Sequence, residues 1–239
     1  MPVKTTFSWN TILSGYAKQG KLEKAHQVFD LIPVRDSVSW TTIIVGYNQM
    51  GRFEDAIRAF VDMVNDKVLP TQFTLTNVLA SCAATGSRGD LEMAKVIFDR
   101  MKLRNTSSWN AMISLHMNCG RVDLALAQFE LMSERDIVSW NSMIAGCNQH
   151  GFDNEALQFF SSMLKDTSLK PDRFSLASAL STCANLERLN FGKQIHGYIV
   201  RTMLDASGAV GNALISMYAK SGGVENCSKN HRAEWDFRS

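Results

Sequence analysis

The chain has 239 residues, of which 45% are hydrophobic and 20% are charged, and its formal net charge is +2. A chain of this length and composition can bury a substantial core, which argues against intrinsic disorder. The small net charge neither requires nor excludes a polyanionic partner. No apolar run approaches the roughly 18 residues of a membrane-spanning helix, so we expect no membrane association.

The cysteine and histidine patterns argue against disulfides and metal sites. The five cysteines lie 28 to 44 residues apart with no C-x-x-C pair, which predicts reduced thiols in the core. The five histidines share no metal-ligand spacing. We therefore expect no metal, no cofactor and no small-molecule substrate.

Four tryptophans head near-copies of one phrase, which predicts an array of repeats. The spacing from Trp9 to Trp40 is 31 residues, and the spacing from Trp109 to Trp140 is again 31. The phrases are SWNTILSGYAKQG, SWTTIIVGYNQMG, SWNAMISLHMNCG and SWNSMIAGCNQHG. Each is followed in register by an alanine and a phenylalanine: Ala25 and Phe29, Ala56 and Phe60, Ala125 and Phe129, and Ala156 and Phe160.

The first copy defines the expected elements. Apolar residues from Trp9 to Tyr16 fall at helical spacing and predict a helix over residues 7–18, called helix A, with Ser8 as its N-cap. Gly20 allows the left-handed backbone that ends a helix, and a second apolar stripe from Leu22 onward predicts helix B. Helices of roughly 12 residues do not persist alone in water, so stability must come from stacking on neighbouring repeats. The predicted fold is all-α, a right-handed solenoid of helix-turn-helix repeats with a long concave face.

The same pattern divides the chain into seven repeats. They begin at Thr6, Ser37, Gln72, Thr106, Ile137, Arg173 and Gly208. This division predicts an array over residues 6–227, with a lead-in over 1–5 and a divergent, disordered tail over 228–239. Repeat 3, residues 72–105, is irregular because its first half is of a long type, its second half is of a short type, and Ser-Arg is inserted between them.

The chain mixes 31-residue repeats that end in Arg-Asp with longer repeats. In this it resembles the pentatricopeptide repeat proteins of plants, in the subclass that mixes long, short and standard motifs. The resemblance covers residues 6–227, including ALISMYAKSGGVE near the end. Tetratricopeptide arrays are the competing family, but they need Gly or Ala where this chain has Leu13, Ile44, Ile113 and Ile144. The spliced repeat 3 and the divergent tail suggest a fragment or a truncated product.

The resemblance implies single-stranded RNA binding with one base read per repeat. The reading residues would be the fifth and the last of each repeat: Asn10 with Asp36, Thr41 with Thr71, Thr76 with Asn105, Asn110 with Asp136, Asn141 with Asp172, and Asn212. In this family Asn with Asp implies uracil, then cytosine, so repeats 1, 4 and 5 would prefer pyrimidines. Thr76 with Asn105 is nominally an adenine pair.

Other polar and aromatic residues have two interpretations each. Lys18 and Lys220 end their A helices and would either contact phosphate or complement the helix dipole. The tryptophans could stack on bases, but their phase with the apolar stripe favours core packing. The methionines of the helix B stripe are expected to fill the core.

Many proteins of the family that this chain resembles end in a cytidine deaminase-like domain. The chemistry of that domain needs the motifs H-x-E and P-C-x-x-C. This chain has neither signature, so we expect it to be no enzyme and to need a separate editing or processing enzyme as partner. The resemblance implies the recognition part of an organellar RNA editing or processing factor. The location would be the mitochondrion or the chloroplast, although no transit peptide is visible. The alternatives are a protein-binding scaffold and a nonfunctional truncated product.

Overall fold

The computed structural model describes residues 5–166, 169–204 and 208–221, and within these it contains thirteen α-helices and no strand. The chain forms two compact lobes, Met1–Cys119 and Gly120–Ser239, which are described separately. The predicted tail, residues 228–239, lies outside the described residues. Within the described part, every helix is too short or too polar to cross a bilayer.

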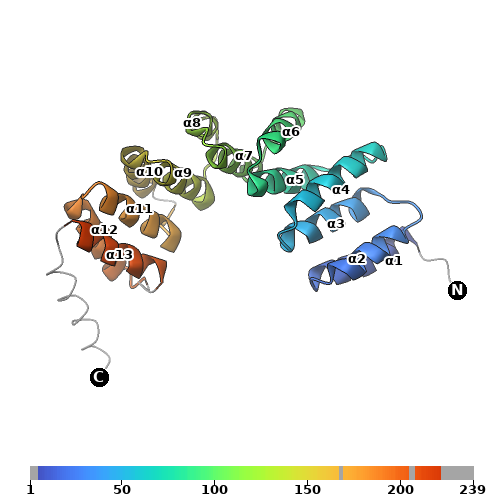
Figure 1. Ribbon diagram of the computed structural model, residues 1–239, viewed down its shortest axis with the longest axis horizontal. Coiled ribbons are helices and arrows are strands. Elements are labelled where there is room, and N and C mark those ends of the chain that lie inside the picture. The colour runs from blue at the N-terminus through green and yellow to red at the C-terminus, as the bar shows by residue number, and fades with distance from the viewer. Residues whose placement is uncertain (1–4, 167–168, 205–207, 222–239) are drawn as a thin grey trace, which may run out of the picture. The chain divides into compact units, whose positions relative to one another are not determined.

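Each lobe consists of antiparallel helix pairs (Figure 1). The N-terminal lobe contains α1 (Thr6–Lys18), α2 (Leu22–Asp30), α3 (Ser37–Gln49), α4 (Phe53–Asn65), α5 (Gln72–Thr85), α6 (Arg88–Arg100) and α7 (Thr106–Asn118). The C-terminal lobe contains α8 (Val122–Glu130), α9 (Ile137–Gln149), α10 (Asp153–Lys165), α11 (Arg173–Asn185), α12 (Leu189–Arg201) and α13 (Ala209–Lys220). The odd-numbered helices are A helices and the even-numbered ones are B helices. The prediction of an all-α repeat solenoid is confirmed.

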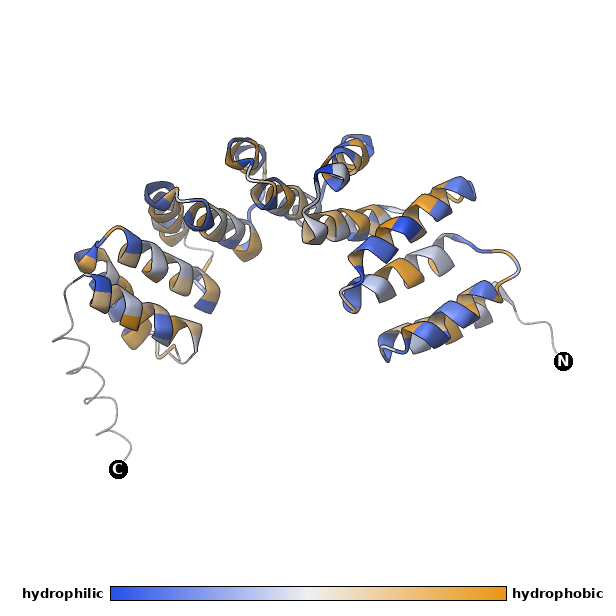
Figure 2. Cartoon of the chain, in the orientation of Figure 1, coloured by the Kyte–Doolittle hydropathy of each residue, from blue (hydrophilic) through white to orange (hydrophobic). Residues whose placement is uncertain are grey.

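Within each lobe, consecutive A helices pack side by side. Five B helices, α2, α4, α6, α10 and α12, pack on their own A helix and on the next one, and α8 packs on α9. The helices alternate apolar and polar residues along their length (Figure 2). The alanine of helix B is fully buried in five repeats, as Ala25, Ala56, Ala94, Ala125 and Ala156. A small side chain at this crossing lets helices A and B approach closely.

The tryptophans and methionines lie in the core. Trp40 and Trp140 are buried, and each meets a phenylalanine of the preceding B helix edge to face, with ring centroids 4.8 and 5.0 Å apart. Met63, Met132 and Met163 are buried on helix B or just after it. The core-packing interpretation of these residues is therefore confirmed.

One capping prediction is wrong. The N-cap of α1 is Thr5 rather than Ser8, because the Thr5 hydroxyl accepts from the amide of Ser8. Ser8 is thus the third residue of the helix. Ser39 and Ser139 hold the same third position in α3 and α9, where each closes a capping box with the aspartate before the helix.

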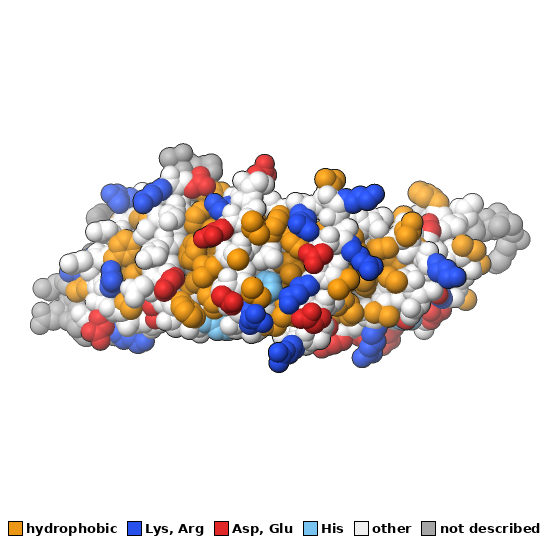
Figure 3. Space-filling model, turned by 90° about the horizontal axis from the view of Figure 1, so that it is seen from above, with side chains coloured by type: hydrophobic (Ala, Val, Ile, Leu, Met, Phe, Trp, Pro, Cys, Tyr) orange, Lys and Arg blue, Asp and Glu red, His pale blue; other side chains and the backbone are white. Residues whose placement is uncertain are grey.

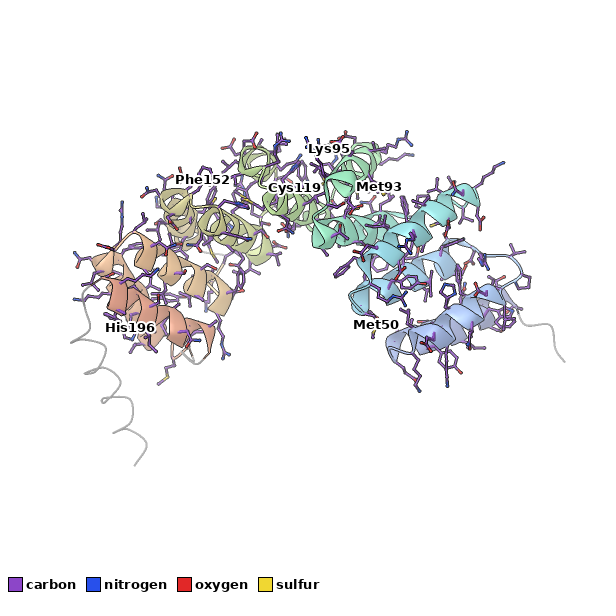
Figure 4. All side chains as sticks on the ribbon, in the orientation of Figure 1. Met50, Met93, Lys95, Cys119, Phe152 and His196 are labelled. Carbon is purple, nitrogen blue, oxygen red and sulfur yellow. The ribbon has the colours of Figure 1, made fainter. Side chains whose placement is uncertain are left out.

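Repeat 3 forms an ordinary helical hairpin despite its irregular sequence. Helix α5 ends at Gly86, whose φ of 61° is left-handed, and the inserted Ser87 is the N-cap of α6, accepting from the amide of Asp90. Cys119, labelled in Figure 4, donates a thiol hydrogen bond of 3.4 Å to the carbonyl of Gly86. Of the two inserted residues, Ser87 therefore lies in the turn between the helices and Arg88 begins α6.

Three buried cysteines occupy matching places on A helices. Burial raises the pKa of Cys82 to about 12 and the pKa values of Cys147 and Cys183 to about 11 each. All three are free thiols, as predicted. Because the thiolate is the reactive form, these groups are unreactive near neutral pH. Cys227 lies outside the described residues.

Candidate nucleic-acid interface

The residues expected to read bases occupy equivalent structural positions. The fifth residue of a repeat lies on the second turn of helix A, and the last residue is the N-cap of the following helix A. These N-caps are Asp36, Thr71, Asn105, Asp136 and Asp172, and the side chain of each accepts from an amide of the next helix. Capping fixes the side chain of the last residue before any ligand binds.

Repeat 1 pairs its two residues directly. The Nδ2 of Asn10 donates to the Asp36 carboxylate, at 3.1 Å from Oδ1 and 3.4 Å from Oδ2. Burial raises the pKa of Asp36, but hydrogen bonds from Ser39, Asn10 and Val38 outweigh it, so the net pKa lies below the ordinary value. The carboxylate is therefore charged at neutral pH, and the Asn10 amide has its orientation set by that charge.

Repeat 5 repeats this geometry in the other lobe. The Nδ2 of Asn141 donates to Oδ2 of Asp172 at 3.0 Å, while Oδ1 of Asp172 accepts from the Ser175 amide at 2.8 Å. The two pairs lie in different lobes. The recurrence of the Asn–Asp hydrogen bond therefore follows from the repeat sequence.

The asparagine carboxamides are more buried than the repeat pattern suggested. Asn110 is 7% exposed and Asn141 is 9% exposed. Within the described structure, the Oδ1 atoms of Asn10 and Asn141 are buried and accept no hydrogen bond. A ligand could therefore reach only a narrow edge of these groups.

Repeat 2 connects its residues through a third hydroxyl. Thr41 donates to the carbonyl of Ser37 at 2.6 Å, and its oxygen lies 2.6 Å from that of Thr74, which in turn lies 2.8 Å from the Thr71 oxygen. Each hydroxyl has one proton, so Thr74 must donate to Thr41, and Thr71 must donate to Thr74. Thr41 therefore has only lone pairs left to offer a ligand.

Repeats 3 and 4 differ from the first. Thr76 donates to the carbonyl of Gln72 at 3.0 Å, and Asn105 caps α7; no hydrogen bond joins Thr76 to Asn105 among the residues that the structure describes. Asn110 and Asp136 lie on different lobes, so their pairing remains a prediction.

The last repeats are incomplete as reading sites. In repeat 6 the fifth residue is Ala177, which has no polar side chain, and the last residue falls in a segment outside the described ranges. Asn212 is exposed on α13. The residue that would complete its pair lies beyond residue 221, also outside those ranges.

The two lysines expected to contact phosphate lie at the ends of A helices. Lys18 is exposed in the last turn of α1, and Lys220 donates to Oδ1 of Asn185 at 3.3 Å from the last turn of α13. The face seen in Figure 3 carries cationic and anionic side chains interspersed, without a wide region of one sign.

A groove beside these residues includes a group that the sequence reasoning missed. It has a volume of about 310 Å³ and lies between α1, α3 and α5, with Lys18, Thr41 and Thr71 in its lining together with exposed apolar side chains. Two of these lining residues, Val38 and Phe73, are the second ones of their repeats. Five such second residues are 50–81% exposed: Phe7, Val38, Phe73, Val138 and Phe174. These residues could be recognised in the sequence because they are apolar but lie outside the stripe of positions that helix A buries.

Family models and curated relatives agree on the kind of repeat. A model described as PPR repeat matches residues 7–36, 83–106, 107–137 and 138–167, and one described as PPR repeat family matches residues 35–84. A pentatricopeptide repeat-containing protein of Arabidopsis thaliana is 54% identical over 206 residues, which cover 73% of this chain and 26% of that protein. A chloroplastic and a mitochondrial relative from the same plant are 36% and 35% identical, over 92% and 89% of this chain. The chain spans about a quarter of the length of these relatives.

Solved structures share the fold. The pentatricopeptide repeat protein PPR10 in complex with an 18-nucleotide psaJ RNA element matches with a TM-score of 0.72 at 19% identity, over 94% of this chain and 34% of that one. The PPR domain of Arabidopsis thaliana protein-only RNase P 1, in complex with tRNA, matches with a TM-score of 0.61 at 15% identity, over 74% of this chain and 95% of that one. With the sequence matches, these likenesses establish that the chain belongs to the pentatricopeptide repeat family.

Proposed function

We propose that this chain binds single-stranded RNA and reads one base per repeat. The observation that carries the proposal is the Asn–Asp pair, which recurs with the same geometry in repeats 1 and 5 of separate lobes. A solved relative of the same fold is a complex with an RNA element, which supports the same class of ligand.

The proposed contact follows from the hydrogens of the amide. The Nδ2 of Asn141 has two hydrogens and donates one to Asp172, which leaves the other for an acceptor such as the O2 of a pyrimidine. The carboxylate holds the amide in place, so little orientational freedom is lost on binding.

Exposed apolar side chains would hold the faces of the base. Val138 and Phe174 flank the pair of repeat 5, and Phe7 and Val38 are their equivalents around repeat 1. Contact between a flat base and such side chains contributes to affinity with little dependence on sequence. The narrow polar edge between them would then select the base.

The expected preferences differ between repeats. Repeats 1, 4 and 5 would take pyrimidines, and repeat 3 would take adenine through Thr76 and Asn105. In repeat 2 the Thr41 hydroxyl has only lone pairs to offer, which favours a base that presents an N–H group. Lys18 and Lys220 would contact backbone phosphates.

The wider role proposed is recognition within an organellar RNA editing or processing factor of the subclass with mixed repeat types. Relatives named chloroplastic and mitochondrial support either organelle. A separate editing or processing enzyme is the partner that we propose for the chemistry.

A protein-binding scaffold is the second candidate, favoured by the row of exposed apolar second residues. Equilibrium binding of a uracil-rich single-stranded RNA, its DNA equivalent and an RNA duplex separates the two. We expect the single-stranded RNA to bind most tightly. Equal binding of all three, or no binding, would contradict RNA recognition.

The residue-level test is Asn141→Ala. We expect its affinity for a uracil-containing strand to fall about fivefold at constant salt, as the loss of one net hydrogen bond predicts. Asn65→Ala is the matched control, since Asn65 is exposed at the end of a B helix. Equal affinities of the two variants would show that Asn141 does not contribute to RNA binding.

A further inference from the structure

Three linkers between helix B and the next helix A contain an arginine immediately before the capping residue. Arg35, Arg104 and Arg135 precede Asp36, Asn105 and Asp136. In each linker, the Nε of the arginine donates to the carbonyl of the phenylalanine six residues earlier, at 3.3, 3.2 and 3.2 Å. The guanidinium carbon lies 4.6 Å from the ring centroid of that same phenylalanine in all three.

The phenylalanine in turn contacts the next helix A. Phe29, Phe98 and Phe129 meet Trp40, Trp109 and Trp140 edge to face, with centroids 4.8, 4.8 and 5.0 Å apart. Each tryptophan lies four residues after the capping residue. The arginine therefore ties the linker to a ring that is itself packed against the helix being capped.

The rest of the linker has little to hold it. In the first linker Leu31 and Val34 are 64% and 74% exposed, whereas Ile32 is 4% exposed. The other two linkers repeat this order, with buried Met101 and Met132 three residues before the arginine. Between that buried residue and the capping residue, the arginine side chain links all three linkers to the core, and in the second linker Gln72 also donates to the carbonyl of Leu103.

Two further linkers use a different means at the same position. Pro70 precedes Thr71, and Pro171 precedes Asp172. A proline ring fixes φ near −65° and restricts the residue before it. In these five linkers, the residue before the capping residue is therefore one that restricts the backbone, either by its ring or by its side-chain contacts.

We infer that Arg35, Arg104 and Arg135 are positioning residues for base recognition. Arg35 holds Asp36 at the height where it meets Asn10, and Arg104 and Arg135 hold the capping residues Asn105 and Asp136 at the equivalent place in their repeats. The arginines do not touch the base. This inference rests on the proposed function, because it assigns the arginines to the accuracy of the same reading pairs.

The test compares base discrimination in Arg35→Lys and in the unaltered chain. Lysine keeps the positive charge, but it has neither the planar group over Phe29 nor the Nε donor. Binding is measured at constant salt for a set of uracil-rich RNAs in which each uracil is replaced in turn by adenine. The position at which Asn10→Ala abolishes discrimination identifies the base opposite repeat 1.

At that position we expect Arg35→Lys to reduce the uracil-to-adenine ratio of affinities about fivefold, as the loss of one aligned hydrogen bond predicts. Discrimination at the base opposite repeat 5 should be unchanged, since its linker contains Pro171. An unchanged helical content by circular dichroism shows that the variant is folded. Arg58→Lys is the matched control, because Arg58 is 77% exposed on α4.

Two results would overturn the inference. One is full discrimination at repeat 1 in Arg35→Lys, even with a lower melting temperature, which would make the arginine purely structural. The other is an equal loss at repeats 1 and 5, which would indicate a general effect. If the unaltered chain discriminates at no position, the proposed function fails instead.

Discussion

The last residue of a repeat has two roles at once, and the pKa of Asp36 reflects both. Its carboxylate accepts from two amides of α3 and from Asn10. A side chain that caps a helix and also orients a neighbour cannot be replaced without losing both effects. The reading pair is therefore part of the fold, which accounts for its presence without a ligand.

The lowered pKa of Asp36 predicts how its contribution depends on pH. A carboxyl group whose folded pKa is depressed stabilises the fold above its unfolded pKa, and this stabilisation is lost as pH falls through the folded pKa. We therefore expect base discrimination at repeat 1 to stay constant from about pH 8 to about pH 5. Binding measured across that range checks this. A decline within it would mean that Asp36 is not held charged.

At the same scale, the sequence predicted that Asn10 and Asp36 hold repeat-equivalent positions, but it did not predict their surroundings. The repeat register identified Asn10 and Asp36, because one register gives one position in the fold. It did not predict the hydroxyl chain through Thr74, which depends on how α5 packs against α3. Nor did it predict the burial of Asn141, which requires the distance between successive A helices.

Helices begin and end where local chemistry dictates, and this could be predicted well from the sequence. Four of the A helices are followed, as expected, by a glycine with a left-handed backbone conformation: Gly20, Gly51, Gly120 and Gly151. The assignment of Ser8 as an N-cap was wrong because Thr5 and Ser8 are both residue types that cap helices. Which of the two is the N-cap depends on where α1 begins, and it begins at Thr6. The insertion in repeat 3 looked disruptive, but the turn before α6 accommodates it.

Two glycines of the N-terminal lobe should respond oppositely to alanine. A Cβ at either Gly15 or Gly51 would meet no atom within 4 Å, but Gly51 has a φ of 70° whereas Gly15 lies inside α1. Gly51→Ala should therefore destabilise the fold by about 1–2 kcal/mol, and Gly15→Ala should stabilise it by about 0.5–1 kcal/mol. Thermal unfolding of the two variants measures this, and shifts in the same direction would contradict the backbone assignment.

For the molecule as a whole, the repeat fold and the weak net charge together limit how RNA could be held. The formal net charge is +2, and charges of both signs are mixed on the surface seen in Figure 3. Long-range attraction is therefore weak. Affinity must come from many similar local contacts, one set per repeat, with few phosphate contacts among them.

This predicts a shallow dependence of RNA affinity on salt. If Lys18 and Lys220 are the phosphate contacts, two charges are neutralised, and the slope of log affinity against log salt should be about −1.4 for a single strand. Replacing both lysines with alanine should bring the slope close to zero. Replacing Lys24 and Lys95, which belong to the B helices α2 and α6, should leave it unchanged. A slope several times steeper would show that other cations hold the backbone and that binding is largely independent of base, contrary to reading by the asparagine pairs.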